Sequence, residues 1–360
     1  MKLSDFGYHL PKELIAQYPS TRRDQSRMMV VYRNTAEILH RHFRDLPDFL
    51  AKRYLIVYND SRVVPCRAFG LKKETGGKFE VFFLKETGDN TWECMLKPKK
   101  RARIGTKIIF GENFMEGEVL GFTGEGMATI KFPEKTKIED FLEKSGHMPL
   151  PPYIKRDYSS KNDEIFERKR YQSIFADKNG SIAAPTAGLH FSKSILARFN
   201  EKNISLVPVT LHVGLGTFLP LRDEEIEKNK LHYEFYSISE KTTDKINNAK
   251  KQGRKIIAVG TTTTRVLETA DMENGIIKPS KGSTNLFLYP GKKFKIVDAL
   301  LTNFHLPKSS LFLLVSAFAE DAMNKPAFTG TELIKKAYNE AVKNKYRFFS
   351  YGDCMLILDK

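Results

Sequence analysis

Residues 180–191 read Gly-Ser-Ile-Ala-Ala-Pro-Thr-Ala-Gly-Leu-His-Phe, and residues 209–218 read Val-Thr-Leu-His-Val-Gly-Leu-Gly-Thr-Phe. Both segments contain glycines and a histidine, and small residues allow a backbone to approach a ligand closely. The second predicts a strand over 206–212 that runs into a glycine turn, where α/β proteins usually bind ligands. The alternative is a pair of tight turns in which His190 and His212 are structural residues.

The elements predicted around these segments are typical of an α/β domain, with a mixed sheet and flanking helices. In the N-terminal part we expect strands at 28–32 and 54–58 and short helices at 11–17 and 45–52. In the C-terminal part the predicted helices are 193–199, 223–230, 239–252, 261–268, 309–319 and 331–345. The predicted strands there are 206–212, 255–260, 285–289, 295–299 and 353–358.

Between residues 60 and 150 the pattern changes to short strands separated by turn residues, without a long helix. The expected strands are 66–71, 78–84, 92–96, 107–110, 117–120 and 127–131, followed by a short helix at 136–144. This spacing is typical of a small all-β barrel or sandwich. We therefore predict a β-barrel-like domain over 60–150, inserted into a discontinuous α/β domain made of 1–59 and 151–360.

Composition indicates a folded cytoplasmic protein of about two domains. The chain has 360 residues, of which 41% are hydrophobic and 28% charged. Its first residues lack the apolar core of a signal peptide, and its longest apolar run, 311–319, is too short to cross a bilayer. The three cysteines are widely spaced and form no Cys-x-x-Cys pair, so we expect neither a disulfide framework nor a metal site.

A net charge of +16 favours a polyanionic partner, because cations that face phosphates release condensed counterions. The densest basic run, Lys-Pro-Lys-Lys-Arg-Ala-Arg at 97–103, is followed by Lys107, and no acid occurs between 95 and 111. On a loop of the predicted barrel, this run is suited to contacting RNA phosphates. The alternative is a charged loop that is merely solvated.

The junction of Gly260 and Thr261 predicts a second ligand contact, at a turn from strand to helix. The first amides of a helix are unpaired and lie at its positive end, which suits a carboxylate. Arg265, one turn later, is expected to pair with the same carboxylate. The alternative is ordinary capping of the helix by Thr261 or Thr262.

Ten blocks distributed along the chain carry a resemblance to a known family. They are 24–28, 57–67, 171–175, 180–191, 209–218, 231–234, 259–268, 284–291, 300–309 and 346–353. Together they resemble the signature blocks of the S-adenosylmethionine:tRNA ribosyltransferase-isomerase family of queuosine biosynthesis. Block 259–268 departs from the family pattern at Thr263, Thr264 and Val266. In block 284–291, Asn285 replaces the usual acid, which puts any role of that acid in doubt.

The resemblance implies that the chain moves the ribosyl part of S-adenosylmethionine onto the aminomethyl-deazaguanine at the tRNA wobble position. Epoxyqueuosine then forms, and adenine and methionine leave. The implied partners are S-adenosylmethionine, as a ribosyl-donating co-substrate, and tRNA carrying the precursor base. We expect no prosthetic group, no metal and no membrane, and we expect a monomer.

The candidate site residues follow from these blocks and from chemistry. Histidines transfer protons well near neutral pH, and the catalytic candidates are His190, His212, Glu234 and His305, with the identity of the base left open. The candidates for S-adenosylmethionine binding are Thr186, Gly188, Gly214, Gly216, Thr217, Gly260, Thr261, Thr262, Arg265 and Asn303. The candidates for tRNA binding are Arg62, Arg67, Lys97, Lys99, Lys100, Arg101, Arg103 and Lys107.

Two other classes of protein remain as alternatives. A non-catalytic RNA-binding protein accounts for the basic run but leaves the glycine loops and histidines without a role. A methyltransferase that uses S-adenosylmethionine usually has a glycine-rich turn after its first strand and then a ribose-binding acid, and this sequence lacks that pattern.

Overall fold

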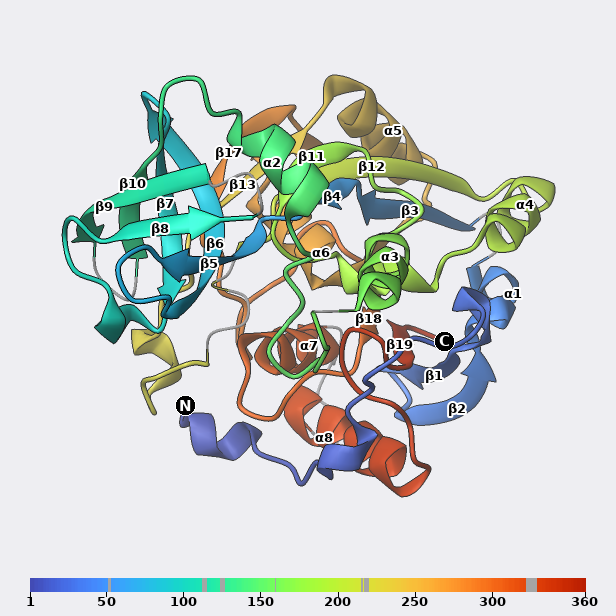
Figure 1. Cartoon of the computed structure of the whole chain (residues 1–360). Helices are drawn as coiled ribbons and strands as arrows, with labels where there is room; N and C mark the ends of the chain where they lie inside the picture. Colours follow the sequence, from blue (N-terminus) through green and yellow to red (C-terminus); the bar gives the residue numbers. More distant parts are fainter. Residues whose placement is uncertain are drawn as a thin grey trace. The chain divides into compact units, whose positions relative to one another are not determined.

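The computed structural model describes residues 1–50, 53–111, 115–123, 127–158, 160–214, 216, 220–321 and 329–360. The chain forms two compact units (Figure 1). Unit 1 contains Met1–Arg62, Pro151–Lys155 and Gln172–Lys360, and unit 2 contains Val63–Leu150 and Arg156–Tyr171. The predicted insert, 60–150, differs from unit 2 mainly because the segment Arg156–Tyr171 packs with the barrel rather than with the α/β unit.

Unit 1 is built on one mixed sheet of nine strands. Its order is β17 (Ser280–Thr284), β13 (Glu234–Ile238), β12 (Ser205–Leu211), β3 (Tyr54–Asn59), β14 (Lys255–Val259), β18 (Ala299–Asn303), β19 (Cys354–Leu358), β1 (Arg27–Tyr32) and β2 (Glu37–His42). The four central strands β12, β3, β14 and β18 are parallel. Antiparallel pairs flank them, with β13 on one side and β19 on the other.

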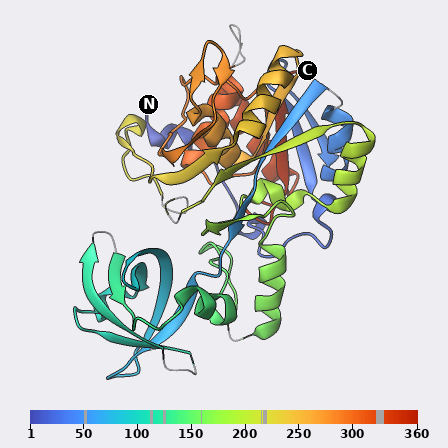
Figure 2. The ribbon, with the colours of Figure 1, turned by 90° about the horizontal axis from the view of Figure 1, so that it is seen from above.

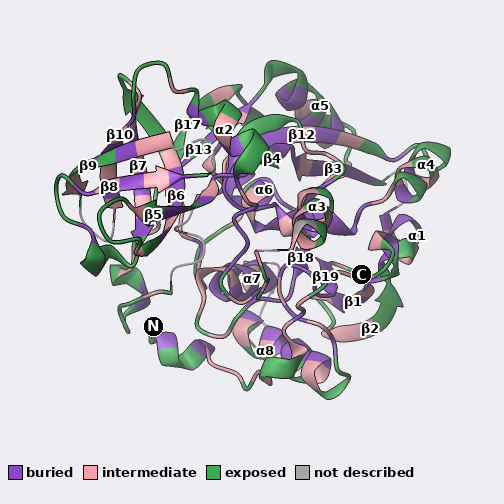
Figure 3. Ribbon diagram, in the orientation of Figure 1, coloured by how far each residue is buried: buried purple, intermediate pink, exposed green. Residues whose placement is uncertain are grey.

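Both faces of this sheet are buried. Successive residues of a strand point to opposite sides, so each central strand contributes side chains to two cores. Leu55 and Val57 of β3 belong to one core, and Tyr54 and Ile56 belong to the other. The first core also contains residues of α5 (Glu240–Lys251), α6 (Gly260–Thr269), α7 (Ser310–Asp321) and α8 (Gly330–Lys343). The second contains residues of α1 (Leu46–Leu50) and α4 (Lys193–Glu201). Figure 2 shows α5 and α4 on opposite sides of the sheet, and β3 and β18 are buried over most of their length (Figure 3).

Unit 2 is a closed barrel of six antiparallel strands. Their order is β10 (Met127–Lys131), β7 (Thr91–Lys97), β6 (Lys78–Gly88), β5 (Arg67–Lys72), β8 (Lys107–Phe110) and β9 (Met115–Thr123). Its interior contains the rings of Phe83, Phe110 and Phe132, which lie within 6.0 Å of one another between centroids. Two helices complete the unit, α2 (Ile138–Ser145) and α3 (Lys161–Arg170). The predicted combination of a mixed α/β sheet with a small barrel is thus confirmed.

Several predicted elements differ from the structure. Residues 285–289 and 295–298 form no strand, because Leu286, Phe287 and Phe294 pack against the first core from loops. The helices predicted at 11–17 and 223–230 are only single 3-10 turns, Lys12–Leu14 and Ile226–Lys228. The remaining short strands form two-stranded pairs, β4 (Ser61–Val63) with β11 (Lys178–Ser181) and β15 (Met272–Glu273) with β16 (Ile276–Ile277).

Candidate active site

The candidate residues of unit 1 lie along the carboxyl edge of the four parallel strands. His212 follows β12, Asp60 follows β3, Gly260 follows β14, and Asn303 is the last residue of β18. This edge is where open α/β sheets bind ligands. Because strands lie about 4.8 Å apart, the ends of β12 and β18 are separated by roughly 14 Å. The site is therefore an extended row of groups.

The two glycine segments that the sequence singled out are hydrogen-bonded to each other. Ile182 N donates to Val213 O at 2.8 Å, and Val213 N donates to Ser181 Oγ at 2.9 Å. Gly180 has φ +130°, and a Cβ at this position would come within 3.2 Å of the His212 ring. A glycine is required here both by the backbone conformation and by the approach of the histidine.

His190 is held at the β18 end of the edge by an amide network. Asn303 Nδ2 donates to His190 Nε2 at 3.1 Å, and Thr186 Oγ1 donates to Asn303 Oδ1 at 2.9 Å. The imidazole also stacks on Phe43, with 5.3 Å between ring centroids. Burial, and then the positive charges of Arg23 and Arg347, lower the pKa of His190 to about 3. The ring is therefore a neutral, fixed group near neutral pH.

His305 lies in the core beyond the same strand. Its Nε2 and Thr302 Oγ1 are 2.9 Å apart, and its backbone N donates to Tyr338 Oη at 3.1 Å. Tyr8 Oη donates to His305 O at 2.5 Å. Burial lowers the pKa of His305 to about 3. These contacts fix the loop after β18, so His305 has the environment of a structural residue.

The lowered pKa values of His190 and His305 make the free energy of unfolding depend on pH. An unfolded histidine has a pKa of about 6.5, so below that pH the unfolded chain binds protons that the folded chain excludes. Their contribution is complete above about pH 6.5 and is lost as the pH falls toward 3. Between about pH 6 and pH 4 we expect the free energy of unfolding, measured with urea, to fall by ~1.4 kcal/mol per pH unit for each histidine.

His305→Gln should reduce the slope of the unfolding free energy against pH by the contribution of one histidine, ~1.4 kcal/mol per pH unit. The same slope in wild type and variant would show that His305 becomes protonated in the folded protein.

His212 is the least buried of the four catalytic candidates. It is half-buried, and its ring stacks on Phe235 with 5.6 Å between centroids. Burial lowers the pKa of His212, and the nearby carboxylate of Asp60 partly opposes this. Its Nδ1 is buried and has no hydrogen-bond partner among the described residues. A buried polar atom without a partner is uncommon in folded proteins and marks a place to look for a ligand.

The start of α6 is not capped by a side chain. Its N-cap residue is Val259, while Thr263 Oγ1 and Thr264 Oγ1 donate back to Val259 O at 2.7 Å and Gly260 O at 3.1 Å. Capping by Thr261 or Thr262 is therefore not what the structure shows. Thr262 Oγ1 is buried without a hydrogen-bond partner among the described residues. The helix start thus presents amides and a hydroxyl that suit an anion.

Glu234 and Arg265 form a buried ion pair behind this helix start. Arg265 Nη1 donates to Glu234 Oε2, and Glu234 Oε1 accepts the amide of Gly214 at 2.8 Å. The Arg265 Nε donates to Leu286 O at 3.1 Å. The guanidinium therefore has a carboxylate of this chain as a partner, while its pairing with a ligand carboxylate stays a prediction. The pair connects the second glycine segment to α6.

The remaining ligand-binding candidates occupy tight backbone positions. Gly260 has φ +89°, and a Cβ there would lie 3.4 Å from Ala187 Cβ, so the first glycine segment approaches the start of α6 closely. A Cβ on Gly188 would meet Ser173, and one on Gly216 would meet the His232 ring. Thr217 lies outside the described residues.

The tRNA candidates form two groups: cations that bond to other groups of this chain, and exposed cations that make no ion pair with a described residue. Arg62 donates to Ala176 O at 3.0 Å, Arg67 pairs with Glu80 at 2.6 Å, and Lys107 pairs with Glu116 at 3.2 Å. The other five are exposed and make no ion pair with a described residue: Lys97, Lys99, Lys100, Arg101 and Arg103. They lie on the end of β7, a 3-10 turn and the loop that follows. These five residues are called the basic run below.

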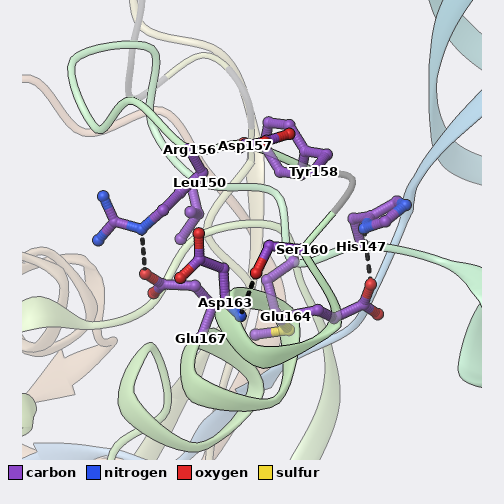
Figure 4. A pocket seen from close by; sticks show the side chains of 10 residues that line it. His147, Leu150, Arg156, Asp157, Tyr158, Ser160, Asp163, Glu164 and Glu167 are labelled. Carbon is purple, nitrogen blue, oxygen red and sulfur yellow. Dashed lines mark hydrogen bonds and ion pairs between the residues drawn. The ribbon is translucent and has the colours of Figure 1, made fainter.

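Unit 2 also contains a small cavity of about 10 Å³, and most of the residues around it are charged or polar (Figure 4). Figure 4 shows His147 Nδ1 next to Glu164 Oε2 at 2.8 Å and Arg156 Nε next to Glu167 Oε1 at 2.6 Å. A space of this size holds about one water molecule. Its side chains pair with one another and attach α3 to the unit, so the cavity is a packing feature.

Two kinds of feature are absent from the part of the chain that the structure describes. It contains no group of three or more His, Cys, Asp or Glu side chains placed to hold a metal ion. None of its helices has the length and apolar character needed to cross a membrane.

Sequence reasoning missed two residues of the edge. Asp60 accepts a hydrogen bond from Thr210 Oγ1 at 2.7 Å beside His212, and Ser181 joins the glycine segments through its hydroxyl. Asp60 lies in block 57–67 and Ser181 in block 180–191, and the resemblance of these blocks to the family is the signal that could have identified both residues.

Comparison with known proteins gives a consistent result along the chain. The sequence matches the family described as Queuosine biosynthesis protein over residues 3–357. The S-adenosylmethionine:tRNA ribosyltransferase-isomerase of Natranaerobius thermophilus is 47% identical over 358 residues, 99% of this chain and 99% of that protein. The protein of the same name from Acetivibrio thermocellus is 47% identical over 357 residues, 99% of this chain and 100% of that protein.

A solved structure agrees with these relatives. The crystal structure of S-adenosylmethionine tRNA ribosyltransferase from Thermotoga maritima is similar, with a TM-score of 0.54 and 33% identity, and the match covers 98% of this chain and 100% of that one. The chain therefore belongs to the queuosine biosynthesis protein family.

Proposed function

We propose that the chain transfers and rearranges the ribosyl part of S-adenosylmethionine onto the precursor base of a tRNA. Its curated relatives with this activity match it over nearly all of their length. The observation that carries the proposal for the site is the row of groups at the carboxyl edge of β12, β3, β14 and β18. The precursor amine gains the ribosyl group, and adenine and methionine are released.

Of the four catalytic candidates, we propose His212 as the group that takes a proton from the carbon next to the sulfonium. A general base works best when it is unprotonated and near the reactant. The lowered pKa of His212 keeps it neutral at pH 7, and its Nδ1 has no described partner. His190 and His305 have a pKa of about 3, which makes them weak bases. Glu234 is bonded to both Arg265 and Gly214.

The methionine carboxylate of the donor is placed at the start of α6 in this proposal. The amides of Thr261 and Thr262 and the Thr262 hydroxyl are the groups suited to it, since no side chain caps the helix. Phe235, which is 45% exposed and stacks on His212, offers an aromatic surface for a purine beside the proposed base.

The activity is tested by incubating the protein with labelled S-adenosylmethionine and tRNA that carries the precursor base. Release of free adenine and methionine, dependent on that tRNA, is the expected result. Formation of S-adenosylhomocysteine would indicate methyl transfer, and an unchanged donor would indicate binding without catalysis. Either of these outcomes would contradict the proposed function.

The basic run is proposed to hold the phosphates of the tRNA. Replacing Lys99, Lys100 and Arg101 by Gln should weaken binding and should reduce the slope of log affinity against log salt by about 2, because each phosphate that a cation neutralises adds roughly 0.7 to that slope. The measurement is a salt titration of tRNA affinity by fluorescence anisotropy.

A matched control removes the same charge from unit 1. Lys241, Lys245 and Lys251 of α5 are exposed, and their replacement by Gln should leave the slope nearly unchanged. Equal effects of the two triple variants would mean that overall charge, rather than the basic run, determines affinity.

A further inference from the structure

The wall of the barrel carries a hollow with a volume of about 850 Å³, within the range of ligand-binding sites. We name it the Phe69 hollow, and its lining includes Phe69, Leu71, Ile109 and Tyr158. Phe69 is 41% exposed and Leu71 is 48% exposed. Exposed apolar residues that gather in a concavity, rather than being scattered, usually mark a binding surface.

Strand register explains why these apolar side chains share one surface. Phe69 and Leu71 alternate with the buried Ala68 and Gly70 along β5, so both point away from the barrel interior. Leu71 lies directly opposite Ile109 of β8. Other residues fill the barrel interior, so Phe69 and Leu71 are not needed to pack it.

An aromatic ring closes one side of the hollow in a fixed position. The ring centroids of Tyr158 and Phe69 are 5.4 Å apart. The guanidinium of Arg67 lies 3.9 Å from the Tyr158 ring centroid and is paired with Glu80 at 2.6 Å. The Tyr158 ring is thus held by a cation whose charge is already balanced within unit 2.

The charge at the rim is predominantly positive. Lys72 and Lys78 line the hollow and make no ion pair with a described residue, while Lys73 is paired with Glu116. Asp157 is the exposed acid of the lining. The excess of lysines favours an anionic ligand with an apolar part.

The hollow lies on the same outer surface of the barrel as the start of the basic run. Phe69 of β5 lies opposite Glu80 of β6, and Glu80 lies opposite Lys97 of β7. Two strand spacings, roughly 10 Å, therefore separate Phe69 from the first cation of the basic run on the same outer surface. Glu80 between them is neutralised by Arg67.

We propose that the Phe69 hollow binds unpaired bases of the RNA substrate, while the basic run and the rim lysines contact the neighbouring phosphates. Aromatic side chains beside a positive surface bind single-stranded nucleic acid by stacking, independently of sequence. The proposal rests on the proposed RNA substrate and adds the part of the RNA that is recognised and the surface that recognises it.

The test compares three RNA probes by fluorescence anisotropy: an anticodon stem-loop, the same stem-loop with abasic loop nucleotides, and a fully paired duplex of equal length. Phe69→Ala should weaken binding of the stem-loop roughly tenfold and leave the abasic and duplex probes unchanged. Phe69→Trp should keep the affinity, and the stem-loop should quench the emission of the new tryptophan by stacking on it. The change can be assigned to position 69, because Trp92, the natural tryptophan, is buried.

Leu120→Ala is the matched control, since Leu120 is 48% exposed on β9 of the same barrel and does not line the hollow. Stem-loop affinity that is unchanged in Phe69→Ala, or lowered equally for abasic and paired probes, would overturn the proposal. A loss of self-association in Phe69→Ala, without a change in RNA affinity, would assign the hollow to a second copy of the chain and would also overturn it. Adenine release by the wild-type protein is measured separately, so failure of the proposed function is distinguishable from failure of this proposal.

Discussion

His212→Ala is expected to lower the rate of tRNA-dependent adenine release by more than tenfold while the fold is retained. Positioned general bases typically contribute ~10²–10⁴-fold, which is the loss expected if His212 takes the ribosyl proton. The half-buried ring lies just after the end of β12 rather than in a core, so little packing is lost with it. The measurement is kcat and KM for both substrates, with circular dichroism to check the fold. The main effect should be on kcat.

Two readouts separate a base from a structural histidine. Added imidazole should restore part of the activity of His212→Ala, because a small base can occupy the space left by the ring. In the wild-type protein, kcat/KM should decline only below pH 6.5, since the pKa of His212 is lowered in the fold. A variant that keeps the wild-type rate would exclude His212 as the base.

Other histidines provide the comparison. His9 is exposed, so His9→Ala should leave activity and stability unchanged. His190→Ala should lower activity too, but together with the free energy of unfolding, because its ring packs on Phe43 and is bonded to Asn303. Loss of activity in His212→Ala without loss of stability is therefore the result that identifies the base.

The parts of the fold that could be predicted from sequence are those with a local pattern. The strand predicted at 107–110 agrees with β8 at both ends, because Ile108, Ile109 and Phe110 form a short apolar, β-branched run between turn residues. The helix predicted after Gly260 is α6, since a glycine turn follows a buried apolar strand. The helix predicted at 193–199 is α4, and Ser192 caps it by accepting the amide of Ile195 at 3.3 Å.

The parts that were missed depend on contacts between distant residues. The sequence of α3 is mostly charged and has no apolar stripe, and the helix is attached to the rest of unit 2 through pairs such as Glu164 with His147. The apolar residues at 285–289 look like a strand, but they pack on the core from a loop. At the site, local motifs selected the residues, whereas their partners depend on the fold. Glu234 and Arg265 are 31 positions apart, and nothing in either block indicates that they pair.

Arg265→Met is expected to lower the free energy of unfolding by about 3–5 kcal/mol, because it leaves the Glu234 carboxylate buried without its counter-charge. The side chains of the pair are only 7% and 5% exposed. Urea unfolding followed by circular dichroism is the suitable measurement, since Trp92 lies in unit 2 and does not report on this pair. The contrasting exposed pair is Lys228 with Glu225, at 61% and 63% exposure, where Lys228→Met should cost less than about 1 kcal/mol.

The double variant Glu234→Gln with Arg265→Met shows whether the stability lost in Arg265→Met comes from a buried, unpaired carboxylate or from lost packing. With the carboxylate neutralised, much of the stability lost in Arg265→Met should return, while the glutamine oxygen can still accept the amide of Gly214. If Arg265→Met alone loses less than about 1 kcal/mol, the pair does not secure the second glycine segment against α6. If the double variant is no more stable than Arg265→Met, the loss comes from the packing and hydrogen bonds of the arginine, including its bond to Leu286 O. Recovery of both stability and adenine release in the double variant would show that the pair serves the site by holding Gly214 in place, and that its charges are not needed for the chemistry.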